Sequence, residues 1–364
     1  MKILYFSLDY THHDHQFLSA LAKTEHEVHY VRLERGKHQA EERPIPTNIH
    51  QVQWMGGQKE FHWAYLPRLT FEFRHLTERI RPDLVHAGPI QTCGFIAAVS
   101  GFHPLLTMSW GFDLLQDADR NTGWRWVTRY TLRHSTFFTS DAEVTRQKAI
   151  AFGMRPERTS VFPWGVDLER FTPGNPSKRP QEFVLLCNRS WEPRYGVDIL
   201  AHAFIRLARE RKDIRLLLIG TGSQAVTIRK ILEGGGVTEQ VKFTGQVPQV
   251  ELPGYYQMAD LYISPSHVDG SSVSLMEALS CGLPCLVSDI PANREWISEG
   301  VNGWLFPDGD AEALAAKISA VLENRISLMK IRQAARCTAE EKADWRKNFS
   351  KLLDTYRQTV LQNV

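Results

Sequence analysis

Short apolar runs alternate with helix-like stretches along the whole chain, in two series. The first series is Lys2–Leu8, Glu27–Leu33, Asp83–Ala87, Leu105–Met108 and Thr136–Thr139, and the second is Glu182–Cys187, Ile214–Ile219, Val241–Thr244, Leu261–Ser264 and Cys285–Ser288. Strands that alternate with helices form parallel sheets covered by helices on both faces. The pattern therefore predicts an α/β protein of two tandem, Rossmann-like, doubly wound domains. Because such sheets bind ligands at the carboxyl ends of their strands, we expect the domains to face a central cleft.

A proline-rich stretch separates the two series. Residues 163–180 hold four prolines together with glycine, asparagine and serine, a composition typical of a linker. We predict a first domain over residues 1–170, a linker over 171–180, a second domain over 181–338 and a C-terminal segment over 339–364. The last segment is expected to be one helix, Ala339–Gln362, that returns toward the first domain. Its apolar face holds Trp345, Phe349, Leu352 and Tyr356.

The composition argues against several classes of protein. A chain of 364 residues is too long for one ordinary core, which supports two domains. The net charge of +2 gives no argument for a nucleic-acid partner, and no run of about 18 apolar residues is present to span a membrane. Residues 1–7 are too short for a signal peptide, and five cysteines without a CxxC pattern suggest a reducing compartment. We therefore expect a cytoplasmic protein in which Cys281 and Cys285 are packing residues.

The segment from Ser264 to Asp289 carries the strongest functional signal. A short apolar strand runs into a Gly/Ser turn, and the turn opens a helix that contains Glu277 and ends near Cys281-Gly-Leu-Pro284. Ser271 or Ser272 is expected to cap this helix, which leaves free N–H groups and the positive end of the dipole for an anion such as a phosphate. Asp269 and Glu277 flank the turn with acceptors for sugar hydroxyls. A phosphate site beside two such carboxylates describes a nucleotide sugar.

Two arginines follow the first strand of the second series. Arg189 and Arg194 lie in a strand-to-helix loop, at the same sheet edge as the Ser271 turn. One helix terminus stabilises a charge by about 0.3–1 kcal/mol, which is small for a departing nucleoside diphosphate. Fixed cations or a metal must supply the rest, and arginine binds phosphate oxygens with two parallel hydrogen bonds. The alternative is a surface loop with two solvated arginines.

No convincing metal site is found in the sequence. Asp117 and Asp119 have a DxD spacing, but they lie in a polar stretch and are expected to be solvated. His12, His13 and His15 have no distant partner residue, so we predict no metal ligands and no cofactor other than the donor substrate.

Two further loops of the second series are candidates for the nucleotide. Gly220-Thr-Gly222 follows a strand, and its glycines would let the backbone approach the nucleotide. The loop Gly245–Pro248, with Val247, could present backbone groups to a base edge. Tight turns are the alternative for both.

These residues resemble the retaining glycosyltransferases of the GT-B fold, family 4. The signature is two acidic residues with seven between them, here Asp269 and Glu277, followed by Ala278-Leu-Ser-Cys-Gly-Leu-Pro284. The downstream stretches Ser288–Glu295 and Gly300–Pro307 are also similar to the family pattern. In the first half the resemblance is looser, at Asp83–Ala87, Trp110–Asp113 and Pro163–Asp167.

The resemblance implies a role for each matching residue. Glu277 would hold the ribose, Asp269 would face the donor sugar, and Arg189 and Arg194 would neutralise the diphosphate. The distal phosphate would meet the backbone of Gly270, Ser271, Ser272 and Val273. The wider donor site would include Gly222 and Val247. The implied reaction moves a sugar from a UDP-sugar or another nucleoside-diphosphate sugar, such as a GDP-sugar, to a hydroxyl of a glycan, a lipid-linked or a small-molecule acceptor, without a metal.

The chain departs from the family pattern at three places. The first acid is Asp269 where Glu is usual, Arg194 is followed by Tyr195 before Gly196, and the glycine-rich loop after the first strand is replaced by Asp9–His15. The last change favours an acceptor site lined by side chains. The candidates for that site are His13, Asp14, His86, Trp110 and Asp113.

Other readings remain open at the level of the sequence. A non-catalytic sugar-nucleotide-binding subunit and a sugar-nucleotide epimerase of the same fold are the alternatives, whereas a nicotinamide dehydrogenase is disfavoured because no GxGxxG follows the first strand. The stretches Phe61–His75 and Trp124–Arg133 mix basic and aromatic residues. Such stretches favour either peripheral contact with the inner face of a membrane or ordinary helices that pack on the sheet.

Overall fold

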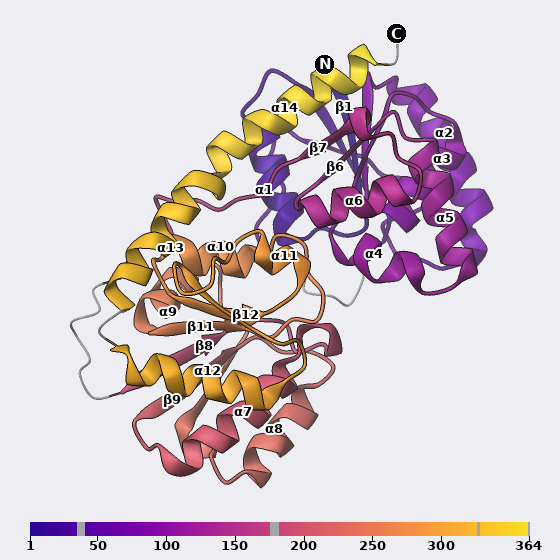
Figure 1. Ribbon diagram of the computed structural model, residues 1–364. Coiled ribbons are helices and arrows are strands. Elements are labelled where there is room, and N and C mark those ends of the chain that lie inside the picture. The colour runs from indigo at the N-terminus through magenta and orange to yellow at the C-terminus, as the bar shows by residue number, and fades with distance from the viewer. Residues whose placement is uncertain (35–40, 175–181, 326–327, 363–364) are drawn as a thin grey trace. The chain divides into compact units, whose positions relative to one another are not determined.

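The computed structural model describes residues 1–34, 41–174, 182–325 and 328–362, and these form two compact units (Figure 1). The first unit comprises residues 1–162 together with 349–364, and the second comprises residues 163–348. Residues 175–180 of the predicted linker lie outside the described residues. Among the described residues, no helix is long and apolar enough to cross a bilayer.

The first unit is built on a seven-stranded sheet in which every pairing is parallel. Its strands are β1 (Lys2–Ser7), β2 (Glu27–Arg32), β3 (His50–Gln51), β4 (Leu84–Gly88), β5 (Leu105–Met108), β6 (Phe137–Ser140) and β7 (Thr159–Val161). Its helices are α1 (His12–Leu21), α2 (Leu66–Ile80), α3 (Phe95–Ser100), α4 (Phe112–Leu115), α5 (Thr122–Arg133) and α6 (Glu143–Ala151). The strands lie in the order β3-β2-β1-β4-β5-β6-β7, so the winding reverses between β1 and β4.

The second unit repeats this plan with a six-stranded parallel sheet. Its strands are β8 (Phe183–Cys187), β9 (Ile214–Ile219), β10 (Val241–Gly245), β11 (Leu261–Ser264), β12 (Cys285–Ser288) and β13 (Gly303–Phe306). Its helices are α7 (Val197–Glu210), α8 (Ala225–Gly234), α9 (Leu252–Met258), α10 (Val273–Ser280), α11 (Pro291–Arg294), α12 (Ala311–Glu323) and α13 (Leu328–Lys342). The order β10-β9-β8-β11-β12-β13 places the reversal between β8 and β11.

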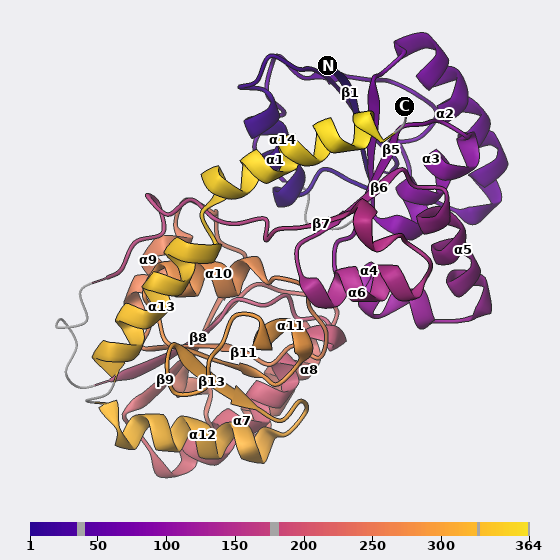
Figure 2. The same ribbon diagram turned by 45° about the horizontal axis from the view of Figure 1, so that its top comes forward.

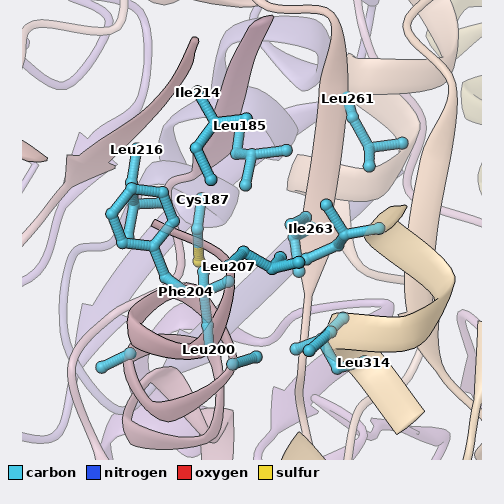
Figure 3. Close-up of a cluster of buried hydrophobic side chains, with 14 of the residues drawn as sticks. Leu185, Cys187, Leu200, Phe204, Leu207, Ile214, Leu216, Leu261, Ile263 and Leu314 are labelled. Carbon is cyan, nitrogen blue, oxygen red and sulfur yellow. The ribbon is translucent and has the colours of Figure 1, made fainter. Parts of the chain in front are cut away.

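Side chains of the second sheet alternate between two cores. Leu185 and Cys187 of β8 point into one core with Phe204 of α7, as Figure 3 shows, whereas Val184 and Leu186 point into the core on the opposite face. This alternation is the period of a β-strand, and burial on both faces explains why these strands appear in the sequence as continuous apolar runs. The prediction of two doubly wound α/β domains is confirmed, and the ten predicted strands agree with the structure to within one residue at each end.

Three strands were not predicted, and all of them lie at a sheet edge. Strand β3 has two exposed residues, and β7 has three half-buried residues. Strand β13 begins at Gly303, where a Cβ atom would collide with the carbonyl oxygen of Cys285 on the neighbouring strand. Such short strands carry too little apolar pattern to be recognised without their neighbours.

The prediction of one C-terminal helix over Ala339–Gln362 is wrong. The segment forms two helices, α13 and α14 (Trp345–Leu361), which Figures 1 and 2 show as separate rods. Between them Val166 donates its N–H to the carbonyl of Ala343 (2.8 Å) and accepts from the N–H of Trp345 (3.2 Å). The Asp344 carboxylate accepts from the N–H of Arg346 (2.9 Å), which caps the new helix. Leu352 and Tyr356 are buried, whereas Trp345 and Phe349 are half-buried.

Candidate functional site

The candidate site of the second unit lies where the winding of the sheet reverses. Arg189 follows the carboxyl end of β8, and the turn that holds Asp269 follows the carboxyl end of β11, the neighbouring strand. Ligands of doubly wound sheets bind at the carboxyl ends of the two strands that flank this reversal. The fold therefore brings together residues that are 80 positions apart in the sequence.

Helix α10 begins at Val273 with Ser272 in the capping position, but the Ser272 side chain makes no capping hydrogen bond. The expected cap by Ser272 is therefore wrong. The Ser272 hydroxyl instead accepts a hydrogen bond from Nη1 of Arg189 (2.6 Å), and Ser274 Oγ accepts from the same nitrogen (2.9 Å). Ser271 Oγ accepts from the indole Nε1 of Trp296 (3.0 Å). The serines thus hold the arginine and the turn in place.

Arg189 is a buried cation, with 9% of its surface exposed. Its Nη2 lies 2.7 Å from Oδ2 of Asp269, and its guanidinium carbon lies 4.2 Å from the centre of the Tyr195 ring. Burial alone would lower the pKa of Arg189, but Asp269 and then Tyr195 raise it above its ordinary value, so the cation persists. Burial also raises the pKa of Asp269, although Arg189 opposes that shift. A cation fixed in a desolvated site attracts an anion far more strongly than one in water.

Arg194 lies on the short 3₁₀ turn Pro193–Tyr195, and its side chain is half-buried. Its charge, with the larger contribution of Arg189, opposes the rise in the pKa of Asp269. The structure thus brings both predicted arginines near this carboxylate. Gly196 follows with a positive φ of 58°, and a Cβ atom there would collide with the carbonyl oxygen of Pro265. The residue that departs from the family pattern, Tyr195, supplies the ring beneath the Arg189 guanidinium.

Glu277 lies in the second turn of α10, with only 3% of its surface exposed. Its Oε2 accepts a hydrogen bond from the Tyr256 hydroxyl (2.7 Å), and that hydroxyl accepts from Nδ2 of Asn188 (2.7 Å). Buried carboxylates need such partners. Sequence reasoning missed Tyr256, because nothing near it in the chain marks it as a partner of Glu277.

The two glycine-containing loops make different contacts. A Cβ atom on Gly222 would lie 2.5 Å from the carbonyl oxygen of Trp191, so this glycine permits close packing of two loops. Gly220, with a φ of 108°, donates its N–H to the carbonyl of Gly245 (2.7 Å). Val247 is half-buried against the core. Contact of Gly222 and Val247 with a nucleotide stays a prediction.

The residues proposed for the acceptor lie in the first unit: His13 and Asp14 follow β1, Trp110 and Asp113 follow β5, and His86 lies within β4. The rings of His13 and Trp110 lie 5.1 Å apart, and His13 Nδ1 is buried without a hydrogen-bond partner among the described residues. Burial, with a smaller effect from His12, lowers the pKa of His13 to about 3, so the imidazole is neutral near pH 7. A neutral, unpaired ring nitrogen beside an indole suits a polar, uncharged ligand.

The other three acceptor candidates are engaged in the framework of the first unit. Asp14 closes a capping box with Thr11 at the start of α1 and accepts from the Tyr5 hydroxyl (3.1 Å). Asp113 accepts from the N–H groups of Ile90, Trp110 and Leu114, at 3.0, 3.0 and 3.1 Å. His86 shares a hydrogen bond of 2.8 Å with the Tyr356 hydroxyl. Their contact with an acceptor stays a prediction.

The residues considered as metal ligands in the sequence contact other protein side chains in the structure. Asp119 pairs with Arg125 and with Lys148 on the surface. His12 contacts Arg43, and His15 contacts Tyr10. Within the described parts of the chain, no group of three or more His, Cys, Asp or Glu side chains is arranged to hold a metal ion.

Both halves of the chain match models of known protein families. The profile described as Glycosyl transferases group 1 matches residues 170–338, and the profile described as Glycosyltransferase Family 4 matches residues 12–170. Together the two matches run without a gap from residue 12 to residue 338.

Curated relatives have related names. The chain is 28% identical over 201 residues to the amylovoran biosynthesis glycosyltransferase AmsK of Erwinia amylovora, covering 54% of this chain and 49% of that protein. It is 26% identical over 294 residues to the GDP-mannose-dependent alpha-(1-6)-phosphatidylinositol monomannoside mannosyltransferase of Mycolicibacterium smegmatis, covering 74% of each. A third, the phosphatidyl-myo-inositol mannosyltransferase of Mycobacterium leprae, is 33% identical over 175 residues, 48% of this chain and 46% of that protein. In two of these three, the match spans about half of the relative's length.

Solved structures share the fold at low identity. HepE of Anabaena in complex with UDP-glucose superposes with a TM-score of 0.79 at 20% identity, covering 98% of this chain and 100% of that chain. Sucrose-phosphate synthase of Thermosynechococcus elongatus superposes with a TM-score of 0.84 at 18% identity, covering 98% of each chain. With the two profile matches, the chain belongs to the family 4 glycosyltransferases of the GT-B fold, as the resemblance predicted.

Proposed function

We propose that this protein transfers a sugar from a nucleoside-diphosphate sugar to a hydroxyl group of a glycan, a lipid-linked or a small-molecule acceptor. The observation that carries the proposal is the buried guanidinium of Arg189, which Ser272, Ser274 and Asp269 hold at the start of α10. A UDP-sugar is the favoured donor and a GDP-sugar the second. The names of similar proteins support both classes, since HepE was solved with UDP-glucose and one mannosyltransferase depends on GDP-mannose.

The diphosphate of the donor would lie against the N-terminal end of α10. The N–H groups of Ser271, Ser272 and Val273 would bind the distal phosphate, and Arg189 and Arg194 would neutralise the charge. The Arg189 Nε atom is buried and has no hydrogen-bond partner within the described residues, so a donor remains available there. Glu277, held by Tyr256, would accept from the ribose hydroxyls, and Asp269 would face the donor sugar.

The proposed reaction keeps the configuration of the sugar by attack on the same face. The bond between the anomeric carbon and the phosphate oxygen breaks, and the acceptor oxygen bonds to that carbon. The acceptor proton moves to the leaving phosphate oxygen. Arg189, Arg194 and the start of α10 would stabilise the charge that develops on the leaving group, so the proposal assigns no step to a metal.

A contact of the first unit with an anionic membrane is a further part of this proposal. Tyr65, Phe71 and Trp126 are 53%, 59% and 58% exposed, and the ring of Trp63 lies 6.0 Å from that of Trp124. Exposed aromatic residues interleaved with arginines suit the interface of a bilayer with anionic lipids. We propose a cytoplasmic protein that can bind the inner face of a membrane.

A thermal-shift panel tests the donor site first. UDP, GDP, ADP and CMP and their sugars are added with and without EDTA, because a ligand that binds the native state raises the melting temperature. We expect stabilisation by one diphosphate, insensitive to EDTA, and its loss in Arg189→Ala. Absence of any shift would contradict the donor site. Release of diphosphate and glycosylated product would separate a transferase from a passive binder, and release of an epimer would indicate the epimerase.

A further inference from the structure

A basic cavity lies in the first unit, away from the residues proposed to bind substrates. Its volume is about 270 Å³, and Arg133, Arg155 and Arg158 are among the residues that line it, together with Ser135 and Gly153. Arg133 and Arg155 are exposed, and Arg158 is half-buried. Its walls come from the connection between α5 and β6 and from the connection between α6 and β7. These connections precede their strands, whereas His13 and Trp110 follow theirs. The cavity therefore lies at the opposite edge of the first sheet from the acceptor candidates.

The three arginines have no neutralising partner in the part of the chain that the structure describes. None of them takes part in an ion pair or a side-chain hydrogen bond with a described residue, and no acidic residue lines the cavity. Other arginines of this unit do pair with a carboxylate, such as Arg32 with Asp9 at 3.2 Å and Arg146 with Glu143 at 2.8 Å. Three like charges around one cavity repel one another, most strongly at low salt, and an anion between them would relieve that repulsion.

Gly153 leaves room for the Arg133 side chain beside this cavity. Gly153 has a positive φ of 107°, and a Cβ atom there would lie 2.9 Å from Nε of Arg133. The carbonyl groups at the end of α5 attract one cation, and Arg133 is the last residue of that helix. This effect fades within the last turn. It does not account for Arg155 and Arg158, which lie beyond the end of α6.

We propose that this cavity is a binding site for a phosphate group, separate from the donor site. Arginine binds phosphate oxygens with two parallel hydrogen bonds, and three guanidinium groups can more than neutralise the charge of about −1.5 to −2 that a phosphate monoester carries near pH 7. The volume admits a phosphate group together with part of the molecule that carries it. Trp126, Arg129 and Arg133 follow one another at helical spacing and therefore share one side of α5. Because Trp126 could contact a membrane on that side, a lipid head group and a soluble compound are both sources of the phosphate, and the vesicle experiment below distinguishes them.

Calorimetric titration of the full chain with sodium phosphate tests the site, with sodium chloride at equal ionic strength as the blank. The test variant is Arg155→Ala/Arg158→Ala. The control is Arg209→Ala/Lys330→Ala, which removes the same charge from exposed positions of the second unit. We expect the test variant to bind phosphate at least about tenfold more weakly, and the control variant to bind as the wild type does. Arg189→Ala separates the two proposals, because it should keep the binding at the cavity even if the donor site is lost.

The melting temperature provides a second measurement that does not depend on detecting heat. In a phosphate-free buffer of low salt, Arg155→Ala should melt higher than the wild type, because one repelling charge is removed. In phosphate the order should reverse. A variant that melts lower than the wild type in both buffers, with unchanged binding of phosphate, would overturn the proposal and make the arginines structural.

Vesicles identify the source of the phosphate. We mix the protein with phosphatidylcholine vesicles that contain or lack phosphatidic acid and separate the bound protein by flotation. Binding to the acidic vesicles that inorganic phosphate reverses at constant ionic strength supports the site with a lipid phosphate as its ligand. Calorimetric binding of phosphate without such flotation supports the site with a soluble phosphate compound as its ligand.

Discussion

At the scale of single residues, the candidate site depends on partners that lie far apart in the chain. Arg189, Asp269 and Glu277 were predicted, because a strand followed by a polar turn marks them locally. Tyr256 and Trp296 were not, because their hydrogen bonds to Glu277 and Ser271 exist only after the sheet has formed. A sequence pattern can identify the groups that would meet a ligand, but not the groups that orient them.

Replacement of Arg189 by lysine tests whether its geometry matters beyond its charge. A single ammonium group cannot reach Ser272, Ser274 and Asp269 together, so we expect turnover to fall by about 10²–10³-fold with a smaller change in KM for the donor. The matched control is Arg206→Lys, whose exposed pair with Glu312 should be worth at most about 1 kcal/mol. Steady-state kinetics measures both variants. Unchanged turnover in Arg189→Lys would show that the charge of this residue suffices and that the geometry of its guanidinium group adds nothing to catalysis.

His86 makes the stability of the first unit depend on pH. Burial lowers its pKa to about 3 from an ordinary 6.5, so between these values the unfolded chain binds a proton that the folded chain does not. Stability is therefore lost as the pH falls below 6.5, by up to about 1.4 kcal/mol per pH unit. In His86→Gln that loss should be absent. The melting temperature of the variant relative to the wild type should rise from pH 7 to pH 5.

Two carboxylates titrate in the opposite sense over the same range. Burial raises the pKa of Asp14 and of Asp113 to about 6, so the folded state binds the extra proton there and acid favours folding. Both are present in the wild type and in His86→Gln, so their contribution cancels in the comparison. His202→Gln is the control, because this histidine is exposed on α7. A difference in melting temperature that does not change with pH would contradict the buried, neutral state of His86.

At the scale of elements, ten strands could be predicted, whereas β3, β7 and β13 at the sheet edges could not. Most residues of the ten predicted strands are buried or half-buried, so their apolar composition suffices, even for β10 at an edge. The break between α13 and α14 was missed, because the signal lies elsewhere in the chain. Gly165 has a φ of 81°, and a Cβ atom there would lie 2.8 Å from the carbonyl oxygen of Ala343 and 2.9 Å from Cα of Trp345.

Substitution of Gly165 by alanine should therefore loosen the junction between α13 and α14. The free energy of unfolding should fall for two reasons: by about 1–2 kcal/mol because alanine disfavours the left-handed backbone, and by about 1–3 kcal/mol because its Cβ atom collides with residues 343 and 345. Gly300→Ala is the control, because Gly300 has a φ of 72° and a Cβ atom there would meet no atom within 4 Å. This variant should lose only the stability that the left-handed backbone requires. Urea unfolding measures both variants. Equal losses of stability would show that the contact with residues 343–345 carries no energy.

At the scale of the whole molecule, association with membranes would depend on a few exposed side chains. We expect Trp126→Ala to weaken binding to anionic vesicles by about 1.5–3 kcal/mol, the free energy of burying a large apolar side chain. Val226→Ala is the control, because Val226 is 64% exposed but lies in the second unit. Sedimentation with vesicles measures both. Equal binding of the wild type and Trp126→Ala to the vesicles would show that Trp126 does not contact the membrane.

The assignment of residues 349–364 to the first unit has a consequence for synthesis on the ribosome. Leu352 and Tyr356 are buried in that unit, but they emerge only after residues 163–348 have been made. At 5–20 residues per second, the first 162 residues wait roughly 10–40 s for their last helix. The usual order of cotranslational folding is thus reversed: the second unit can be complete while the first still exposes the apolar surface that α14 will cover.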